Sequence, residues 1–284
     1  MSYDDFLTSE RRETSSFPIM QRSGIALFRP MAQLSLGTLR GIGQRVLFLR
    51  DLWLAFREPR TYLPHVIPQM RAIGVDSLPL TIMVAGFIGG VISLQVRYQL
   101  FPGIQLSIVG LSVRQMVVLE VGPLLTGLVL AGRVGARMTA EIGTMRVTEQ
   151  IDALETLAYD PVAYLVVPRI IAAVLMLPVL VVFADIFGII SGLFAAITVT
   201  DVPLSQFMEG LRLGFDPFQV TYSLIKATMF GSAIAFLCSY EGYATTAGAE
   251  GVGKSTAKAV VISSMAILVL DALTALVLAP YLQG

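Results

Sequence analysis

Few side chains in this sequence have the types and spacing that chemistry requires. There is one histidine, His65, and one cysteine, Cys238, so an internal disulfide is excluded and a histidine-based triad or a His/Cys metal site lacks residues. The run Gly248-Ala-Glu-Gly-Val-Gly-Lys-Ser255 matches the phosphate-binding pattern G-x-x-x-x-G-K-[ST], and Asp271 follows the short apolar run Leu268-Val-Leu, as in a Walker B strand. Taken alone, these residues indicate ATP hydrolysis.

The surroundings of this run argue against a nucleotide site. A phosphate-binding loop follows a buried strand of a soluble sheet, whereas here an apolar stretch of helix length precedes the glycines and Asp271 lies inside the next one. We therefore interpret Gly248–Ser255 as a cytoplasmic turn in which Ser255 or Thr256 caps the last membrane span. The chain is then not an enzyme, it holds no cofactor or metal ion, and any ATP is bound by another subunit.

Four charged residues lie inside apolar stretches: Glu120, Asp185, Lys226 and Asp271. A charge at bilayer depth costs roughly 3 kcal/mol on insertion scales, so we expect these side chains to face the protein interior, a cavity or one another. Lys226 is the only cation among them and is expected to pair with Asp271 or Glu120. A structural ion pair and a role in a transport pathway are both compatible with this pattern.

The composition is that of a membrane protein. Hydrophobic residues make up 55% of the 284 residues and charged residues 14%, where a soluble chain carries roughly 25% charged residues. The mean hydropathy is +0.74. Because 20 basic and 20 acidic residues cancel, net charge gives no support to a nucleic-acid partner.

Five apolar stretches are long enough to cross a bilayer. The clearest, Ser77–Val96, carries no formal charge and spans about 30 Å at 1.5 Å per residue. The others cover about 113–136, 162–197, 217–242 and 258–281, with a kink expected at Pro178. We predict an all-α integral membrane protein in which residues 77–284 form a domain of five transmembrane helices.

The residues before the first span divide into two parts. Residues 1–30 contain charges but no apolar run, which predicts a mobile cytoplasmic tail and excludes a signal peptide. In residues 31–76, apolar side chains recur at helical spacing from Ile42 to Phe56 between arginines, typical of an amphipathic helix in the membrane interface. A helix packed on a soluble partner is the alternative. The prolines that follow predict short elbow segments.

The basic residues are distributed unevenly around the spans. Most of them precede the first span or follow spans two and four, whereas Arg97, Arg114 and Arg212 fall on the opposite side. The positive-inside rule then places the N-terminus in the cytoplasm and the C-terminus outside. An odd number of spans leaves no complete inverted repeat within one chain, which suggests a homodimer.

The segment between spans two and three is amphipathic. On a helical projection Val147, Ile151, Leu154 and Ala158 form an apolar stripe. Glu141, Glu149, Asp152 and Glu155 gather on the other side, with Arg146 as their counter-charge. We predict one cytoplasmic helix over about 138–158 with an acidic face, for which simple solvation is the alternative interpretation.

Several motifs in this part of the chain occur together. They are Glu120-Val-Gly-Pro, Ala131-Gly-Arg-Val-Gly-Ala, Ala140-Glu-Ile-Gly-Thr-Met-Arg-Val-Thr-Glu-Gln-Ile-Asp-Ala-Leu154 and Asp160-Pro161. They closely resemble the MlaE (YrbE-type) family of ABC-transporter permeases, which move lipids between bacterial membranes. The likeness extends from about Phe56 to Leu282, and such a long run is far more specific than any short motif.

The resemblance implies roles for these residues. The helix over 138–158 would be the coupling helix that docks into a separate ATPase subunit. Its contacting residues would be Glu141, Met145, Arg146, Glu149, Asp152 and Glu155. Glu120 would lie near the lipid cavity, and Ile92, Gln99 and Leu100 would line it, although ordinary span packing explains these three equally well.

The resemblance also implies partners and a location. The permease would be a homodimer in the bacterial inner membrane, bound to an ATPase that holds ATP and to a periplasmic MCE-domain protein. Its substrate would be a membrane phospholipid, moved between the inner membrane and the MCE carrier. The alternative is an ion- or proton-coupled secondary transporter that uses Glu120, Asp185 and Asp271 as a relay and works without nucleotide.

Overall fold

The computed structural model describes residues 43–246 and 248–282. They belong to two compact units, with the boundary between Asp51 and Leu52. Across these described residues the chain forms helices and turns without strands, which confirms the all-α prediction. In the first unit, residues 43–51 are helical and Val46 and Leu49 of the predicted apolar stripe are exposed. The predicted tail over residues 1–30 lies outside the described residues.

The second unit contains ten α-helices and several shorter helical segments. In chain order the α-helices are α3 (Pro59–Ile73), α4 (Leu78–Gln99), α5 (Ser107–Met116), α6 (Gly122–Leu130), α7 (Ala136–Val147), α8 (Gln150–Thr156), α9 (Val167–Val199), α10 (Leu204–Arg212), α11 (Pro217–Tyr243) and α12 (Gly248–Leu278). Three π-helical segments join some of them: η2 (Val117–Val121), η3 (Ala131–Gly135) and η4 (Val162–Val166). Short 3-10 turns occupy η1 (Val75–Ser77) and η5 (Ala279–Leu282).

Five helical stretches are long and apolar enough to cross a membrane, as predicted. They are Pro59–Gln99, Ser107–Val147, Val162–Val199, Pro217–Tyr243 and Gly248–Leu278. Each overlaps one of the expected spans, so the chain is a multi-pass membrane protein. The second stretch joins α5, α6 and α7 through η2 and η3 into one helical path.

Prolines interrupt the helices less than expected. Pro64 and Pro68 lie inside α3, so the predicted elbow segments form a single helix of 15 residues. Pro178 likewise lies inside α9, a helix of 33 residues in all, and the kink expected there stays a prediction. A proline removes one hydrogen bond, and the packing of the long apolar helices outweighs that local loss.

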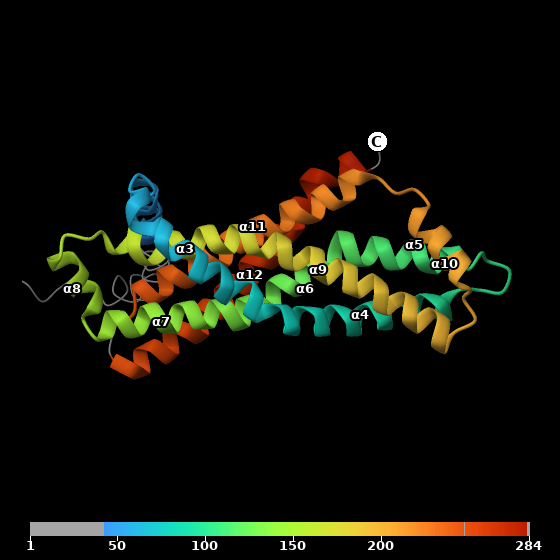
Figure 1. The fold of residues 1–284 in the computed structure, drawn as a ribbon, viewed down its shortest axis with the longest axis horizontal. Helices are drawn as coiled ribbons and strands as arrows, with labels where there is room; N and C mark the ends of the chain where they lie inside the picture. The colour runs from blue at the N-terminus through green and yellow to red at the C-terminus, as the bar shows by residue number, and fades with distance from the viewer. Residues whose placement is uncertain (1–42, 247, 283–284) are drawn as a thin grey trace, which may run out of the picture. The chain divides into compact units, whose positions relative to one another are not determined.

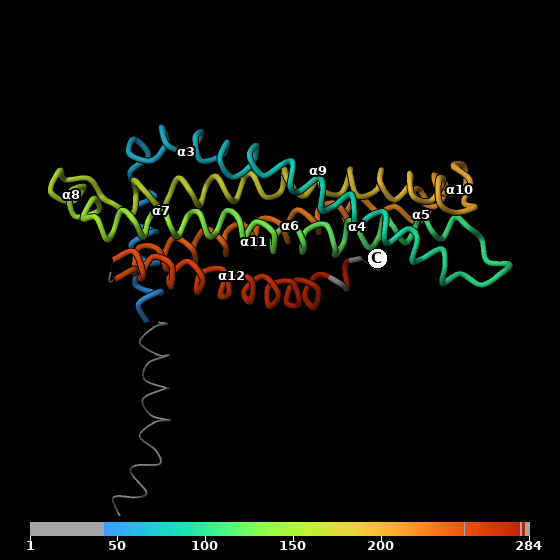
Figure 2. Tube along the Cα trace, turned by 90° about the horizontal axis from the view of Figure 1, so that it is seen from below, coloured from blue at the N-terminus to red at the C-terminus, as the bar shows by residue number. Residues whose placement is uncertain are grey.

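The helices of the second unit lie roughly along one direction (Figure 1). In Figures 1 and 2, α8, the last turn of α11 and the first turn of α12 lie at one end, and α5 and α10 lie at the other. We name these the α8 end and the α10 end. Each end therefore collects segments that are far apart in the sequence.

The first and third spans are held together by glycines. A Cβ atom added to Gly89 of α4 would lie 1.9 Å from the carbonyl oxygen of Gly188 in α9, and one added to Gly192 would lie 3.1 Å from the Gly89 oxygen. Only glycine permits this approach, and small residues provide such close helix contacts in membranes. Beside this crossing, α4 and α9 form an open apolar groove of about 590 Å³, to which Phe87 and Phe194 contribute.

The α10 end is closed by apolar packing and by two arginines. Val109, Val113 and Phe207 are fully buried in one cluster there. Arg97 donates to both carboxylate oxygens of Asp201, at 2.6 and 2.7 Å. Arg114 donates to the carbonyl oxygen of Leu213 at 2.9 Å, so both arginines hold the chain around α10 in place.

Candidate functional site

A buried lysine joins three helical segments in the middle of the bundle. Lys226 of α11 is completely buried, and its Nζ lies 2.6 Å from Oε2 of Glu120 in η2 and 2.8 Å from Oδ1 of Asp271 in α12. The sequence predicted a pair with one of these acids, and the structure pairs Lys226 with both. We call Glu120, Lys226 and Asp271 the charge cluster.

The position of the cluster follows from a proline. Pro123 has no N–H to donate to the Leu119 carbonyl in the α-helical pattern, and the chain before it widens into the π-helix η2. The Leu119 oxygen instead accepts a hydrogen bond from Lys226 Nζ at 3.2 Å. The widened turn thus supplies Lys226 with a neutral acceptor next to Glu120.

The three members of the charge cluster differ in exposure. The side chain of Asp271 is 12% exposed and that of Glu120 is 47% exposed, whereas Lys226 is fully enclosed. Its ammonium also lies 4.9 Å from the ring centroid of Tyr222, one helical turn earlier. Two carboxylates, a carbonyl and a ring therefore compensate the desolvation of one cation, and Glu120 is the most exposed member of the cluster.

Asp185 lies outside the charge cluster. Its Oδ2 accepts a hydrogen bond from Ser223 Oγ at 3.3 Å, while Oδ1 packs so close to Gly122 that a Cβ there would lie 2.1 Å away. Among the described residues, Oδ1 has no hydrogen-bond partner. The structure thus brings Glu120 and Asp271 together at Lys226 and gives Asp185 a separate environment between α9, α11 and α6.

The residues expected to line a lipid cavity are divided by the structure. Ile92 is buried in the apolar cluster at the α10 end, and Leu100 packs partly against that cluster. Gln99 is exposed at the end of α4. Within a single chain, Ile92 and Leu100 therefore make ordinary packing contacts between spans. Their contact with lipid stays a prediction.

The predicted helix over 138–158 is two helices. α7 ends at Val147 and α8 begins at Gln150, because Glu149 adopts the left-handed conformation with φ of 59°. The single continuous helix is thus wrong, although both parts are helical. Arg146 bridges the break, with Nη1 2.6 Å from Oδ1 of Asp152.

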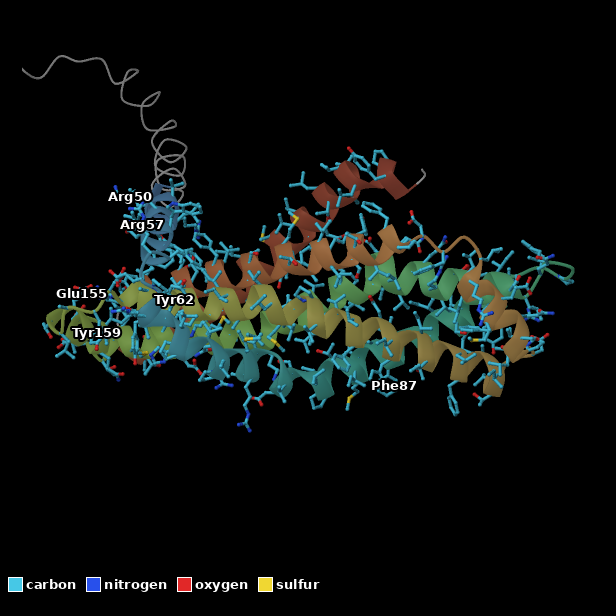
Figure 3. All side chains as sticks on the ribbon, turned by 45° about the horizontal axis from the view of Figure 1, so that its top comes forward. Arg50, Arg57, Tyr62, Phe87, Glu155 and Tyr159 are labelled. Carbon is cyan, nitrogen blue, oxygen red and sulfur yellow. The ribbon has the colours of Figure 1, made fainter. Side chains whose placement is uncertain are left out.

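The acidic face is smaller than the helical projection indicates. Glu141 contacts Arg137 at 2.7 Å and the buried Arg169 of α9 at 3.2 Å, so it is bound within the bundle. Glu149 and Glu155 are exposed and Met145 is half-buried. Figure 3 shows Glu155 at the α8 end beside Tyr159. We call residues 149–157 the docking segment.

The phosphate-binding pattern does not form a loop. α12 begins at Gly248, so Gly248–Ser255 forms its first turns, and the interpretation as a turn capped by Ser255 or Thr256 is wrong. Thr256 lies inside the helix and donates to the Val252 carbonyl at 2.7 Å. Backbone N–H groups beyond the first turn are bonded within the helix, so they are not free to surround a phosphate.

Some residues of these sites were missed from the sequence. Tyr222 lies one turn before Lys226 on the same helix face, so the spacing could have predicted the contact between them. Pro123 lies four residues after Leu119, so the sequence could also have predicted that the Leu119 carbonyl needs another donor. The partner of Glu141, Arg169, is on a different helix and had no such signal. In the described part of the chain, no three His, Cys, Asp or Glu residues gather as a metal site.

The comparisons with known proteins agree with this architecture. The family described as Permease MlaE matches residues 66–277. A probable ABC transporter permease protein of Rickettsia prowazekii is 43% identical over 216 residues, covering 75% of this chain and 82% of that protein. The intermembrane phospholipid transport system permease protein MlaE of Haemophilus influenzae is 30% identical over 233 residues, covering 82% and 89%.

A plant protein is also similar. The protein Trigalactosyldiacylglycerol 1, chloroplastic, of Arabidopsis thaliana is 34% identical over 208 residues, which cover 73% of this chain and 59% of that protein. The family match over residues 66–277 includes the charge cluster and the docking segment. The chain therefore belongs to the MlaE family of ABC-transporter permeases, subunits that carry no ATPase site of their own.

Proposed function

We propose that this chain is the membrane subunit of an ABC transporter that moves phospholipids between the bacterial inner membrane and a periplasmic MCE-domain carrier. The observation that carries the proposal is the helical stretch Ser107–Val147, which carries Glu120 in η2 and ends next to the docking segment. One element thus joins the open member of the charge cluster to a surface where another protein can act.

The distribution of basic residues supports an orientation. The elements toward the α8 end, η3, α7 and the first turns of α12, carry Arg133, Arg137, Arg146, Lys254 and Lys258. The elements toward the α10 end, the last turn of α4, α5 and α10, carry Arg97, Arg114 and Arg212. The positive-inside rule therefore favours a cytoplasmic α8 end and a periplasmic α10 end. The docking segment then faces the compartment that contains ATP.

The physical chemistry of lipids supports an enclosed route. Exposing a lipid with about thirty methylenes to water costs on the order of 25 kcal/mol, at about 0.8 kcal/mol each. A permease must therefore keep the chains in apolar surroundings. A second copy of this chain would complete a cavity between two subunits, with Glu120 near the lipid and the periplasmic carrier receiving it.

The docking segment supports a separate ATPase. Its carboxylates at Glu149, Asp152 and Glu155 are exposed, and such groups fix the register of a partner that presents basic residues. ATP binding or hydrolysis on that partner would move α8 and α7 and close the lipid cavity.

A charge reversal in the docking segment tests this function. The variant Glu149→Lys/Asp152→Lys is co-expressed with the ATPase and reconstituted into vesicles, and ATPase recruitment and ATP-dependent lipid transfer are measured. We expect both to fall at least ten-fold, while Glu209→Lys, an exposed reversal at the α10 end, leaves them unchanged. Survival of both activities would refute the docking role, and lipid or ion movement by the chain alone without nucleotide would favour a secondary transporter.

A further inference from the structure

Helix α11 connects the docking segment with the charge cluster. It runs without interruption from Pro217 to Tyr243, with Lys226 near its middle and Tyr243 as its last residue. About 25 Å of helix separates these two side chains at 1.5 Å per residue. A displacement at one end of this helix therefore reaches the other end.

Tyr243 contacts the arginine that bridges α7 and α8. The Arg146 guanidinium carbon lies 5.7 Å from the ring centroid of half-buried Tyr243, within the range of a cation–π contact. The same guanidinium pairs with Asp152 of α8 at 2.6 Å. Arg146 is therefore held between the docking segment on one side and α11 on the other.

The last turns of α11 are also packed tightly on α7. A Cβ atom added to Gly242 would lie 2.9 Å from the Thr139 carbonyl oxygen and 3.0 Å from Ile142 Cβ. Thr139 Oγ1 in turn donates to the Cys238 carbonyl at 2.9 Å. Such close-packed contacts leave little room for independent sliding, so the ends of α7 and α11 move together.

The other end of the connection is the charge cluster. A shift of α11 changes the distances from Lys226 to Glu120 and Asp271, which belong to two other spans. Because close-packed cores switch between discrete arrangements, a small shift is enough to break or restore one of these pairs. Lys226 is thus placed to respond to movement at Tyr243.

We propose that Tyr243 is a positioning residue that transmits movement of the docking segment, through Arg146, along α11 to Lys226. This inference rests on the proposed function and deepens it, because it names the contact by which ATPase movement reaches the charge cluster. The ring face is the feature that matters: it keeps the Arg146 guanidinium, and with it Asp152 of α8, in contact with the end of α11, so that the three move together.

The test compares two substitutions of Tyr243 in the reconstituted complex of permease, ATPase and MCE-domain protein. Tyr243→Phe keeps the ring face, whereas Tyr243→Leu keeps an apolar side chain but removes the cation–π contact. The measured quantity is phospholipid transferred per ATP hydrolysed. We expect the phenylalanine variant to match the wild type and the leucine variant to fall about five- to ten-fold, with the ATPase still bound and hydrolysing ATP.

Two controls separate a transmitting role from a structural one. Tyr98→Leu makes the same change at an exposed tyrosine of α4 and leaves the ratio unchanged. In an Arg146→Leu background, Tyr243→Leu causes no further loss, because both changes break the same contact. If Tyr243→Leu acted only by lowering stability, its effect would add to that of Arg146→Leu. The double variant therefore separates loss of the contact from loss of stability.

The outcomes distinguish this inference from the proposed function. An unchanged transfer ratio in Tyr243→Leu, or effects of Tyr243→Leu and Arg146→Leu that add, overturns the role of Tyr243 while the wild-type complex still moves lipid. Equal losses in the leucine and phenylalanine variants also overturn it, because the ring face is then not what matters. A wild-type complex that moves no lipid with ATP refutes the proposed function itself.

Discussion

The charge cluster and the docking segment are built from the same residue types and have opposite surroundings. In the cluster, a fully buried lysine contacts two carboxylates from different helices. In the docking segment, Glu149 and Glu155 are exposed, and Arg146 pairs with a single carboxylate, Asp152. Breaking a buried pair costs about 3–5 kcal/mol, whereas an exposed pair contributes about 0–1 kcal/mol. Removing one partner is therefore costly in the first region, whereas the exposed charges of the second remain available to a partner.

The largest effect is expected from Lys226→Met. It leaves two carboxylates facing each other without a cation, which we expect to lower the free energy of unfolding by about 3–5 kcal/mol. Thermal unfolding in detergent measures the change. Lys254→Met is the matched control, because Lys254 makes an exposed pair with Glu250 one turn away, and it should cost less than about 1 kcal/mol. Equal unfolding temperatures for the two variants would mean that Lys226 does not stabilise the fold.

The two acids of the cluster should respond differently to neutralisation. Asp271→Asn removes a nearly enclosed partner of Lys226 and should cost about 3 kcal/mol of stability. Glu120→Gln changes the half-exposed partner and should cost less than about 1 kcal/mol, while lipid transfer falls several-fold. Unfolding and transfer are measured on the same preparations. A transfer rate in Glu120→Gln equal to that of the wild type would argue that Glu120 is only structural.

In the docking segment, replacing glutamate by glycine should have opposite effects on stability at two positions. Glu149 has a φ of 59°, a conformation that glycine adopts without strain, so Glu149→Gly should raise stability by up to about 1 kcal/mol. Glu155 lies inside α8, where Glu155→Gly should lower stability by about 1 kcal/mol. Both variants remove one exposed carboxylate, so their effects on ATPase recruitment should match. Stability changes of the same sign would contradict the break between α7 and α8.

The five spans could be predicted because a bilayer requires long apolar helices, which are visible in the sequence as runs of about 20 mainly apolar residues. The pairing of Lys226 was accessible because it is the only cation among the four charged residues selected inside the apolar stretches, Glu120, Asp185, Lys226 and Asp271. The break at Glu149 was not accessible, since glutamate is a good helix former and the apolar stripe continues past it. The phosphate-binding pattern misled for the opposite reason, because its glycines favour a turn while the helix propagates from Gly248.

Glu141 illustrates a further limit of the sequence. A helical projection places it with the acidic residues of the docking segment, and only the packing of α9 brings Arg169 within 3.2 Å of it. Side chains on one helix are related by fixed spacing, but contacts between helices depend on how the spans are arranged. Glu149, Asp152 and Glu155 of the docking segment are exposed, whereas Glu141 is held by a residue of another span.

The smallest expected effect concerns a third kind of charge pair, at the α10 end. Hydrogen bonds from the Arg97 guanidinium hold the pKa of the Asp201 carboxyl below its ordinary value, although the carboxylate is exposed. A lowered pKa in the folded state contributes stability above the ordinary aspartate pKa of about 4, and this contribution is lost as the pH falls through the folded-state value. The unfolding temperature should therefore fall less steeply below about pH 4 in Asp201→Asn than in the wild type. Identical pH profiles would show that this exposed pair adds nothing to stability, in contrast to the loss expected when one partner of the buried cluster is removed.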